Sequence, residues 1–339
     1  MQSNGHTPHG PLYVILNYFL EPEDGGTTYM LPGTVQDELR VHESACRRCP
    51  RAWQRVQARR AWLSAPESLS EHCTPAMTTE YYDDIQTLLK QRHVPGWLVG
   101  LTSDPPFRDG CADNCCASTG ATSVLPFTHI IHRDSRDVVL AACVDKGPND
   151  LVPMSRPVTY IYIDQSYAGA EQVLRQNVEP AEAHRLGKSR WGIINVWRPI
   201  CLVQRSPLAL CDARSVREED LREMVVSLPK GKAGGLESLS RGDGFRTWNG
   251  AFDRSHAWYW YVDNSIWQID GLKLTHRYRC SDMTPEECWL IKCYDSKTDG
   301  RSRRTPHTSF EMPGQDGSMK GRENIEVRCL VFWESDSAT

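Results

Sequence analysis

Short apolar segments separated by turn-forming residues dominate the second half of the chain. They are rich in β-branched and aromatic residues, so we expect them to form strands. The expected strands cover residues 158–163, 191–197, 256–262, 288–294 and 325–332. Near the start of the chain, the apolar segment 12–20 is followed by Pro22 and by Gly25 and Gly26, which also indicates a buried strand.

Three segments have helical patterns. Residues 81–92 place Ile85, Leu88 and Leu89 on one face with charged residues opposite, which is typical of an amphipathic helix. Residues 180–186, which begin with a proline, and residues 216–224 are expected to be short helices. Strands and helices do not alternate regularly, so the pattern favours a mainly β sandwich or barrel with helices packed outside.

Two segments are expected to be loops. Residues 102–122 are rich in Gly, Ser, Asp, Asn, Pro and Cys, and a long loop of this kind often covers an active site. Residues 230–244 combine glycines with charges but lack the Gly-Lys-Ser/Thr ending of a phosphate loop, so we expect a surface loop or lid. Neither segment is a convincing boundary, and we expect residues 1–339 to form one domain.

Composition narrows the class of partner. The chain has 339 residues, a net charge of −4 and a pI near 6.3, so it lacks the basic field that attracts nucleic acids or anionic membranes. No apolar segment approaches the roughly 20 residues that span a bilayer, and the first residues do not resemble a signal peptide. We therefore expect a cytoplasmic protein whose partner is a small molecule; its oligomeric state stays open.

The 13 cysteines are odd in number and scattered, which favours reduced thiols over a disulfide framework. Cys46 and Cys49, together with Cys111, Cys115 and Cys116, are the candidates for a structural zinc site. Their spacing lacks a regular second half-site to complement Cys46 and Cys49. We expect free thiols at these positions.

Three blocks in a fixed order carry a family resemblance. They are residues 162–166 (Tyr-Ile-Asp-Gln-Ser), 193–199 (Ile-Ile-Asn-Val-Trp-Arg-Pro) and 207–212 (Pro-Leu-Ala-Leu-Cys-Asp), continued by blocks at 256–260, 290–296, 304–310 and 322–328. With these blocks, residues 125–332 resemble the fungal asaB-type hydroxylase/desaturase family, which includes gibberellin desaturase.

The resemblance implies a double-stranded β-helix, the jelly-roll core shared with cupins, with flanking helices. It also implies oxygenase chemistry that uses Fe(II) and 2-oxoglutarate. Family members hold iron with a His-x-Asp pair on one strand and a distant histidine, which here match Asp164 and His307. An Arg-x-Ser pattern that binds the distal carboxylate of 2-oxoglutarate matches Arg322 and Asn324.

This chain departs from the family pattern at Tyr162, where the first histidine is expected, and at Asn324 in place of serine. A phenol has an ordinary pKa near 10 and must lose a proton to bind iron, whereas neutral imidazole binds ferrous iron readily. We therefore expect no metal; if iron is bound, Asp164 and His307 are its ligands.

Other histidines remain alternatives as ligands. His132 and Asp134 form a literal His-x-Asp, although their charged neighbours indicate a solvent-exposed strand end. His256 is a possible replacement ligand, and His129 is expected to be packed or exposed.

Our leading hypothesis is an enzyme of fungal secondary metabolism that has lost iron dependence and needs no cofactor. It would catalyse a redox-neutral cyclisation, such as an intramolecular Diels-Alder closure, or a related lyase or isomerase step on an apolar small molecule. Tyr162 would donate a hydrogen bond to a carbonyl, and Asp164 or His307 would move a proton. The substrate-binding candidates are Arg322, Asn324, Trp197, Arg198, Tyr259 and Lys292, although structural pairing is the alternative role for Arg198 and Lys292.

Two other functions remain open. The first is a hydroxylase or desaturase that uses Fe(II) and 2-oxoglutarate and either tolerates Tyr162 or recruits another ligand. The second is a ligand-binding protein without catalysis.

Overall fold

The structure is a computed structural model. It describes residues 29–30, 34–35, 52–57, 75–90, 119–152, 156–211, 213, 216–226, 245–250, 258–262, 265–270, 283–285, 288–311 and 318–337. The predicted features that lie outside these residues are the strand at 12–20, the loop at 230–244, most of the loop at 102–122, His256 and the two cysteine groups considered for zinc.

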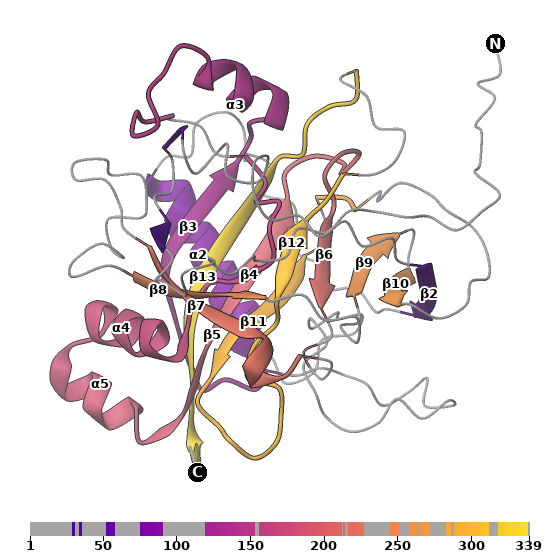
Figure 1. The fold of residues 1–339 in the computed structure, drawn as a ribbon. Helices are drawn as coiled ribbons and strands as arrows, with labels where there is room; N and C mark the ends of the chain where they lie inside the picture. The colour runs from indigo at the N-terminus through magenta and orange to yellow at the C-terminus, as the bar shows by residue number, and fades with distance from the viewer. Residues whose placement is uncertain are drawn as a thin grey trace.

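Two β-sheets form the body of the protein (Figure 1). The nine-stranded sheet contains, in spatial order, β1 (Tyr29–Met30), β7 (Leu221–Val226), β8 (Phe245–Gly250), β4 (Tyr162–Ile163), β12 (His307–Ser309), β6 (Leu208–Cys211), β9 (Trp258–Val262), β10 (Ser265–Asp270) and β2 (Ala52–Gln57). The four-stranded sheet contains β11 (Trp289–Asp295), β5 (Ser189–Pro199), β13 (Asn324–Ser337) and β3 (Ser123–His132). Among the described pairings of these strands, all are antiparallel except that of β1 with β7.

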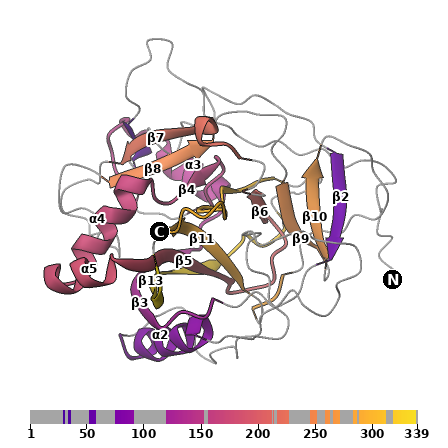
Figure 2. The same cartoon turned by 90° about the horizontal axis from the view of Figure 1, so that it is seen from below.

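The four-stranded sheet buries both of its faces. On the inner face, alternate residues of β5, β11 and β13 pack against Leu208 and Leu210 of β6 and against Met224 of β7, which places one core between the two sheets. On the outer face, the intervening residues pack against α2 (Pro75–Lys90), which lies along this sheet in Figure 2. Side chains alternate between the two faces along a strand, and both faces are buried here. These strands are therefore nearly continuous apolar segments in the sequence.

The other helices are α3 (Arg136–Cys143), α4 (Tyr167–Asn177) and α5 (Pro180–Leu186). The amphipathic helix predicted at 81–92 is confirmed within α2, with Ile85, Leu88 and Leu89 buried on one face. The helix predicted at 180–186 is confirmed as α5. Among the described helices, none combines the length and apolar character that crossing a membrane requires.

One local prediction was wrong, and another was confirmed only in part. Residues 216–224 do not form a helix: a single 3₁₀ turn, Glu218–Asp220, is followed by β7. Asp220 accepts hydrogen bonds from Arg217 and closes that turn, and pairing with β8 then takes the chain into a strand. Of the strand predicted at 158–163, only β4 is paired as a strand segment.

A β-bulge interrupts β11 where it pairs with β5. Lys292 pairs with Ile194 and Tyr294 with Ile193, so Cys293 is the extra residue and has no partner in the register. Gly192 lies beside this bulge, and a Cβ atom built on it would be only 2.6 Å from the carbonyl oxygen of Tyr294. A side chain at this position would therefore push the two strands apart.

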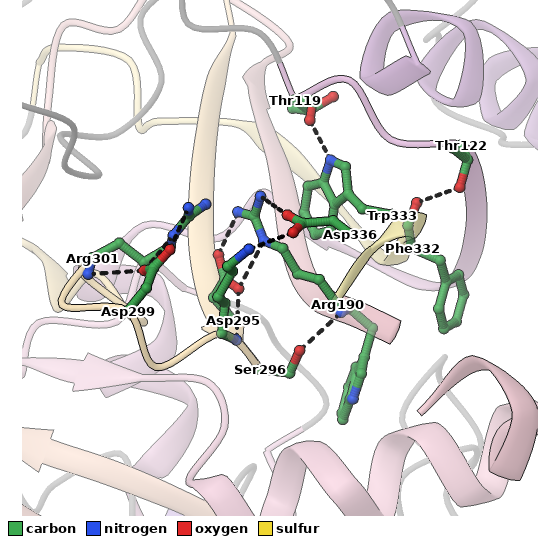
Figure 3. Close-up of polar contacts among 12 residues, drawn as sticks. Thr119, Thr122, Arg190, Asp295, Ser296, Asp299, Arg301, Phe332, Trp333 and Asp336 are labelled. Carbon is green, nitrogen blue, oxygen red and sulfur yellow. Dashed lines mark hydrogen bonds and ion pairs between the residues drawn. The ribbon is translucent and has the colours of Figure 1, made fainter. Parts of the chain in front are cut away.

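An ion-pair cluster lies at one end of the four-stranded sheet (Figure 3). The Nη2 and Nε atoms of Arg190 donate to the two carboxylate oxygens of Asp295 at 2.7 and 3.1 Å, and Lys292 Nζ donates to the same carboxylate at 3.0 Å. Arg190 also lies over the ring of Trp333, 4.0 Å from its centroid. These contacts link β5, β11 and β13 and serve the fold.

The described cysteines are free thiols, and Cys143, Cys211, Cys288, Cys293 and Cys329 are buried. Buried thiols of this kind pack as small apolar side chains.

Candidate active site

Tyr162, Asp164 and His307 come together on the inner face of the nine-stranded sheet. β12 pairs with β4 so that His307 is opposite Tyr162, and Asp164 follows β4 directly. The Nε2 atom of His307 lies 3.5 Å from Oδ2 of Asp164, and the rings of Tyr162 and His307 have centroids 4.3 Å apart. The pairing of two short strands therefore joins residues that are far apart in the sequence.

His307 is fully buried and oriented by its backbone surroundings. Its Nδ1 atom lies 3.0 Å from the carbonyl oxygen of Thr305, which only accepts hydrogen bonds, so Nδ1 is the donor and Nε2 faces Asp164. Within the described residues, Nε2 has no hydrogen-bond partner. A buried imidazole nitrogen with this orientation and a carboxylate oxygen beside it suits two protein ligands of a metal ion.

Asp164 is buried and makes more polar contacts than its neighbours. Oδ2 accepts hydrogen bonds from Asn195 Nδ2 at 2.9 Å and from the thiol of Cys293 at 3.3 Å, and Oδ1 forms an ion pair with Arg328. Burial is the largest single influence and would raise the pKa of Asp164, but the charges of Arg328 and His307 and the hydrogen bonds from Cys293 and Asn195 together outweigh it, so the pKa lies below its ordinary value. Asp164 is therefore a carboxylate.

Tyr162 contributes a neutral phenol. Burial, reinforced by the nearby Asp164 carboxylate, raises the pKa of Tyr162 well above 10. A neutral phenol donates a hydrogen bond and is a poor ligand for ferrous iron. Within the described residues, no set of three His, Cys, Asp or Glu side chains has a geometry suited to a metal ion.

Arg322 places a buried positive charge between the two sheets, where it contacts Ser309 of β12 and Asn324 of β13. Its described hydrogen bonds go to neutral acceptors: the carbonyl of Ser206 at 2.6 Å, Oγ of Ser309 at 3.3 Å and Oδ1 of Asn324 at 3.0 Å. Among the described residues no carboxylate forms an ion pair with it, and the Nδ2 donor of Asn324 is buried without a partner. A buried guanidinium beside an unused amide donor fits the carboxylate of a ligand such as 2-oxoglutarate.

The other predicted substrate-binding residues divide between the two faces of the sheet. Trp197 lies on the inner face with Arg322 over its ring, 5.2 Å from the centroid. Arg198 points to the outer face, where it lies over the ring of Tyr81 in α2. Lys292 is held by Asp295. The structure therefore does not bring Arg198 or Lys292 to Asp164, and only the backbone position of Tyr259, in β9, is described.

His132 differs from what its neighbours in the sequence indicated. It is the last residue of β3, opposite Asn324 in β13, and it is half-buried rather than solvent-exposed. Burial and the charges of Arg322 and Arg328 lower the pKa of His132 to about 3, and its ring makes a hydrogen bond to the backbone of Arg156. The prediction of a solvated strand end was wrong, because the His132 ring lies within reach of the charges of Arg322 and Arg328 and bonds to the Arg156 backbone.

His129 belongs to the outer face, as the alternation along β3 requires. Its Nδ1 atom lies 2.8 Å from the hydroxyl of Tyr82 in α2. The sequence analysis missed Arg328 and Glu326, which contact the site. Residues 322, 324, 326 and 328 are spaced two apart, and alternate residues of a strand share a face. This spacing was the signal available in the sequence.

Comparison with known proteins identifies the family. A family model described as "Oxidoreductase/YMDC permease-like domain" matches residues 107–269 and 272–332. Hydroxylase/desaturase efuI of Hormonema carpetanum is 33% identical over 322 residues, covering 94% of this chain and 94% of that protein. Hydroxylase/desaturase CTB9 of Cercospora beticola is 30% identical and covers 99% of this chain and 91% of its own. The chain belongs to the fungal hydroxylase/desaturase family.

More distant relatives include a cofactor-dependent enzyme and a solved structure of similar fold. The alpha-ketoglutarate-dependent dioxygenase tstK of Talaromyces stipitatus is 26% identical over 64% of this chain and 65% of its own. The structure of the iron and alpha-ketoglutarate-dependent endoperoxidase NvfI aligns with a TM-score of 0.58 at 18% identity, covering 96% of this chain and 97% of that one. The mainly β architecture is thus shared with an oxygenase, as the sequence predicted.

These relatives do not support the leading hypothesis of a cofactor-independent cyclase. Their names describe hydroxylases, desaturases and dioxygenases. The comparisons favour the oxygenase alternative, and the departure expected at Tyr162 alone does not outweigh them.

Proposed function

We propose that this chain is a hydroxylase or desaturase that uses Fe(II) and 2-oxoglutarate to modify a small-molecule intermediate of fungal secondary metabolism. The observation that carries the proposal is a buried Arg322 whose described partners are neutral and which donates to Ser309, two residues after His307 of the Asp164 and His307 pair. The names of the relatives support the same chemistry.

Each part of the site has a distinct task. His307 through Nε2 and Asp164 through Oδ2 would hold iron, and the ring of Tyr162 lies beside that of His307. Bound iron would allow dioxygen, the oxidant, to convert an unactivated C–H bond of the substrate while 2-oxoglutarate is oxidised to succinate and CO2. Arg322 and Asn324 would bind the distal carboxylate of 2-oxoglutarate, and Ser309, which is two residues after His307, fixes the guanidinium.

Turnover of 2-oxoglutarate without substrate tests this proposal. Purified protein supplied with Fe(II), ascorbate, dioxygen and 2-oxoglutarate should form succinate above the level of a His307→Ala variant. A protein that forms succinate at the same rate as this variant, or forms none, would contradict the proposal.

A redox-neutral cyclisation is the second candidate, and two observations favour it. Tyr162 is a hydrogen-bond donor where an imidazole ligand is expected, and Arg328 already neutralises Asp164 without a metal ion. In this function Tyr162 would polarise a substrate carbonyl. Conversion of an intermediate that continues in the presence of a chelator and is lost in Tyr162→Phe would establish it.

A further inference from the structure

Three residues that have no role as ligands contact the Asp164 carboxylate. Arg328 takes Oδ1, whereas Asn195 and Cys293 donate to Oδ2, the oxygen that lies 3.5 Å from His307. Arg328 therefore leaves Oδ2 as the carboxylate oxygen that faces the imidazole. A carboxylate fixed in this way directs a single oxygen, Oδ2, toward His307.

Arg328 is itself held by a second carboxylate. Its Nε atom donates to Oε1 of Glu326 at 3.1 Å, while a terminal nitrogen contacts Asp164. Asn195 Nδ2 lies 3.0 Å from the same Glu326 oxygen and 2.9 Å from Asp164, so it connects the two carboxylates. The planar guanidinium thus spans two acceptors from two of its nitrogens, which the single ammonium of a lysine does not reproduce.

The register of the strands explains why these groups meet. Arg328 in β13 is opposite Asn195 in β5, so both point inward, and Glu326 precedes Arg328 by two residues on the same face. Cys293 joins them through the bulge in β11. The four-stranded sheet therefore supplies the support, and the nine-stranded sheet supplies the residues that are supported.

Full burial gives these contacts their importance. Asp164, Asn195, Glu326 and Arg328 are each at least nine-tenths buried, so water does not replace a contact that is lost. Removal of one partner of a buried ion pair leaves an uncompensated charge. The remaining carboxylate then moves or changes its contacts.

We propose that Arg328, fixed by Glu326, is a positioning residue that orients Asp164 toward His307 for metal binding. This inference rests on the proposed function, because it assigns Asp164 and His307 as the metal ligands. Arg328 does not contact the metal ion in this account. It acts through Asp164 alone.

Cobalt(II) binding by the full chain tests the proposal without requiring turnover. Cobalt(II) is added anaerobically to wild type and to Arg328→Lys, and affinity and visible absorption are recorded. Loss of a support of this kind typically weakens metal binding about 10- to 100-fold, so Arg328→Lys should bind cobalt(II) at least tenfold more weakly and with an altered spectrum. Affinity equal to wild type would overturn the proposal.

Arg190→Lys is the matched control. Arg190 also donates through Nε and a terminal nitrogen to a buried carboxylate, that of Asp295, but at the far end of the sheet (Figure 3). Both variants should lower the melting temperature, and only Arg328→Lys should change cobalt(II) binding. An equal loss of affinity in the two variants would show a general structural effect and overturn the positioning role.

A second variant keeps the test decisive if Arg328→Lys does not fold. Glu326→Gln retains one oxygen acceptor but replaces the carboxyl group whose Oε1 accepts from both Arg328 and Asn195, and should weaken cobalt(II) binding at least threefold. Unchanged affinity would contradict the role of Glu326. If wild type itself does not bind cobalt(II), the proposed function fails, whereas normal binding by wild type and both variants rejects only the positioning role.

Discussion

At the scale of single residues, Arg322 is the side chain whose environment most directly indicates a ligand. Its guanidinium is buried, its described partners are neutral, and burial lowers its pKa to about 10. A buried charge of this kind gains most from a ligand carboxylate, because such a ligand supplies the missing counter-charge.

Arg322→Lys should therefore weaken 2-oxoglutarate binding. Hydrogen bonds to charged groups contribute about 1.5–3 kcal/mol, which corresponds to roughly 10- to 100-fold in affinity. Calorimetric titration measures the change. Arg198→Lys is the control, because Arg198 is equally buried but points toward α2. Equal affinity in wild type and Arg322→Lys would exclude Arg322 from the 2-oxoglutarate site.

Tyr162 is the residue at which the sequence predicts a departure from the ligands expected of the family. Tyr162→His should raise cobalt(II) affinity at least tenfold, since neutral imidazole is a far better ligand than a neutral phenol. Tyr160→His is a suitable control because the Tyr160 ring lies next to Tyr162, with centroids 5.8 Å apart. Unchanged cobalt(II) affinity in Tyr162→His would show that position 162 does not face the metal.

The sequence was sufficient to name Asp164, His307 and Arg322, because each belongs to a block with a recognisable pattern. It did not reveal Arg328 or the burial of His132. Both depend on which strand lies opposite: Arg328 meets Asn195 across β5 and β13, and His132 is opposite Asn324 across β3 and β13. Such pairings are properties of the register and are not visible in a local pattern.

At the scale of elements, the bulge in β11 connects the fold to the site. It places Cys293 against Asp164 and brings the carbonyl of Tyr294 close to Gly192. The amphipathic helix around residue 85 was predictable because its apolar spacing is local. The segment 216–224 was not, because its strand conformation arises from pairing with β8.

Gly192→Ala should destabilise the protein. Its Cβ atom would approach the Tyr294 carbonyl to 2.6 Å, and overpacking of this kind costs about 1–3 kcal/mol. Gly147→Ala is the control, since the nearest atom to its Cβ would be the Asp150 side chain at 3.5 Å. The free energy of unfolding in urea measures both variants. Equal values for wild type and Gly192→Ala would show that the two strands move apart without cost.

At the scale of the whole molecule, the cluster around Asp295 makes stability depend on pH. Burial alone would raise the pKa of Asp295, but hydrogen bonds and charges from Arg190 and Lys292 lower it below 3.8. The folded state thus binds this proton more weakly than the unfolded state. The contribution of Asp295 to stability is present above about pH 4 and is lost as the pH falls through the folded pKa.

Asp295→Asn should reduce stability at pH 7, because it removes one partner of a buried ion pair, at a cost of about 3–5 kcal/mol. The difference from wild type should shrink as the pH is lowered from 5 to below the folded pKa. Thermal melts over this range measure it. A difference that stays constant with pH would show that the charge of Asp295 does not contribute.

The most direct test of the central claim is a calorimetric titration of 2-oxoglutarate into the purified protein under anaerobic conditions, with and without Fe(II). The account predicts one 2-oxoglutarate per chain, bound more tightly when Fe(II) is present, with the heat lost in Arg322→Lys. The absence of binding under both conditions would contradict the account and favour a redox-neutral function for the same fold.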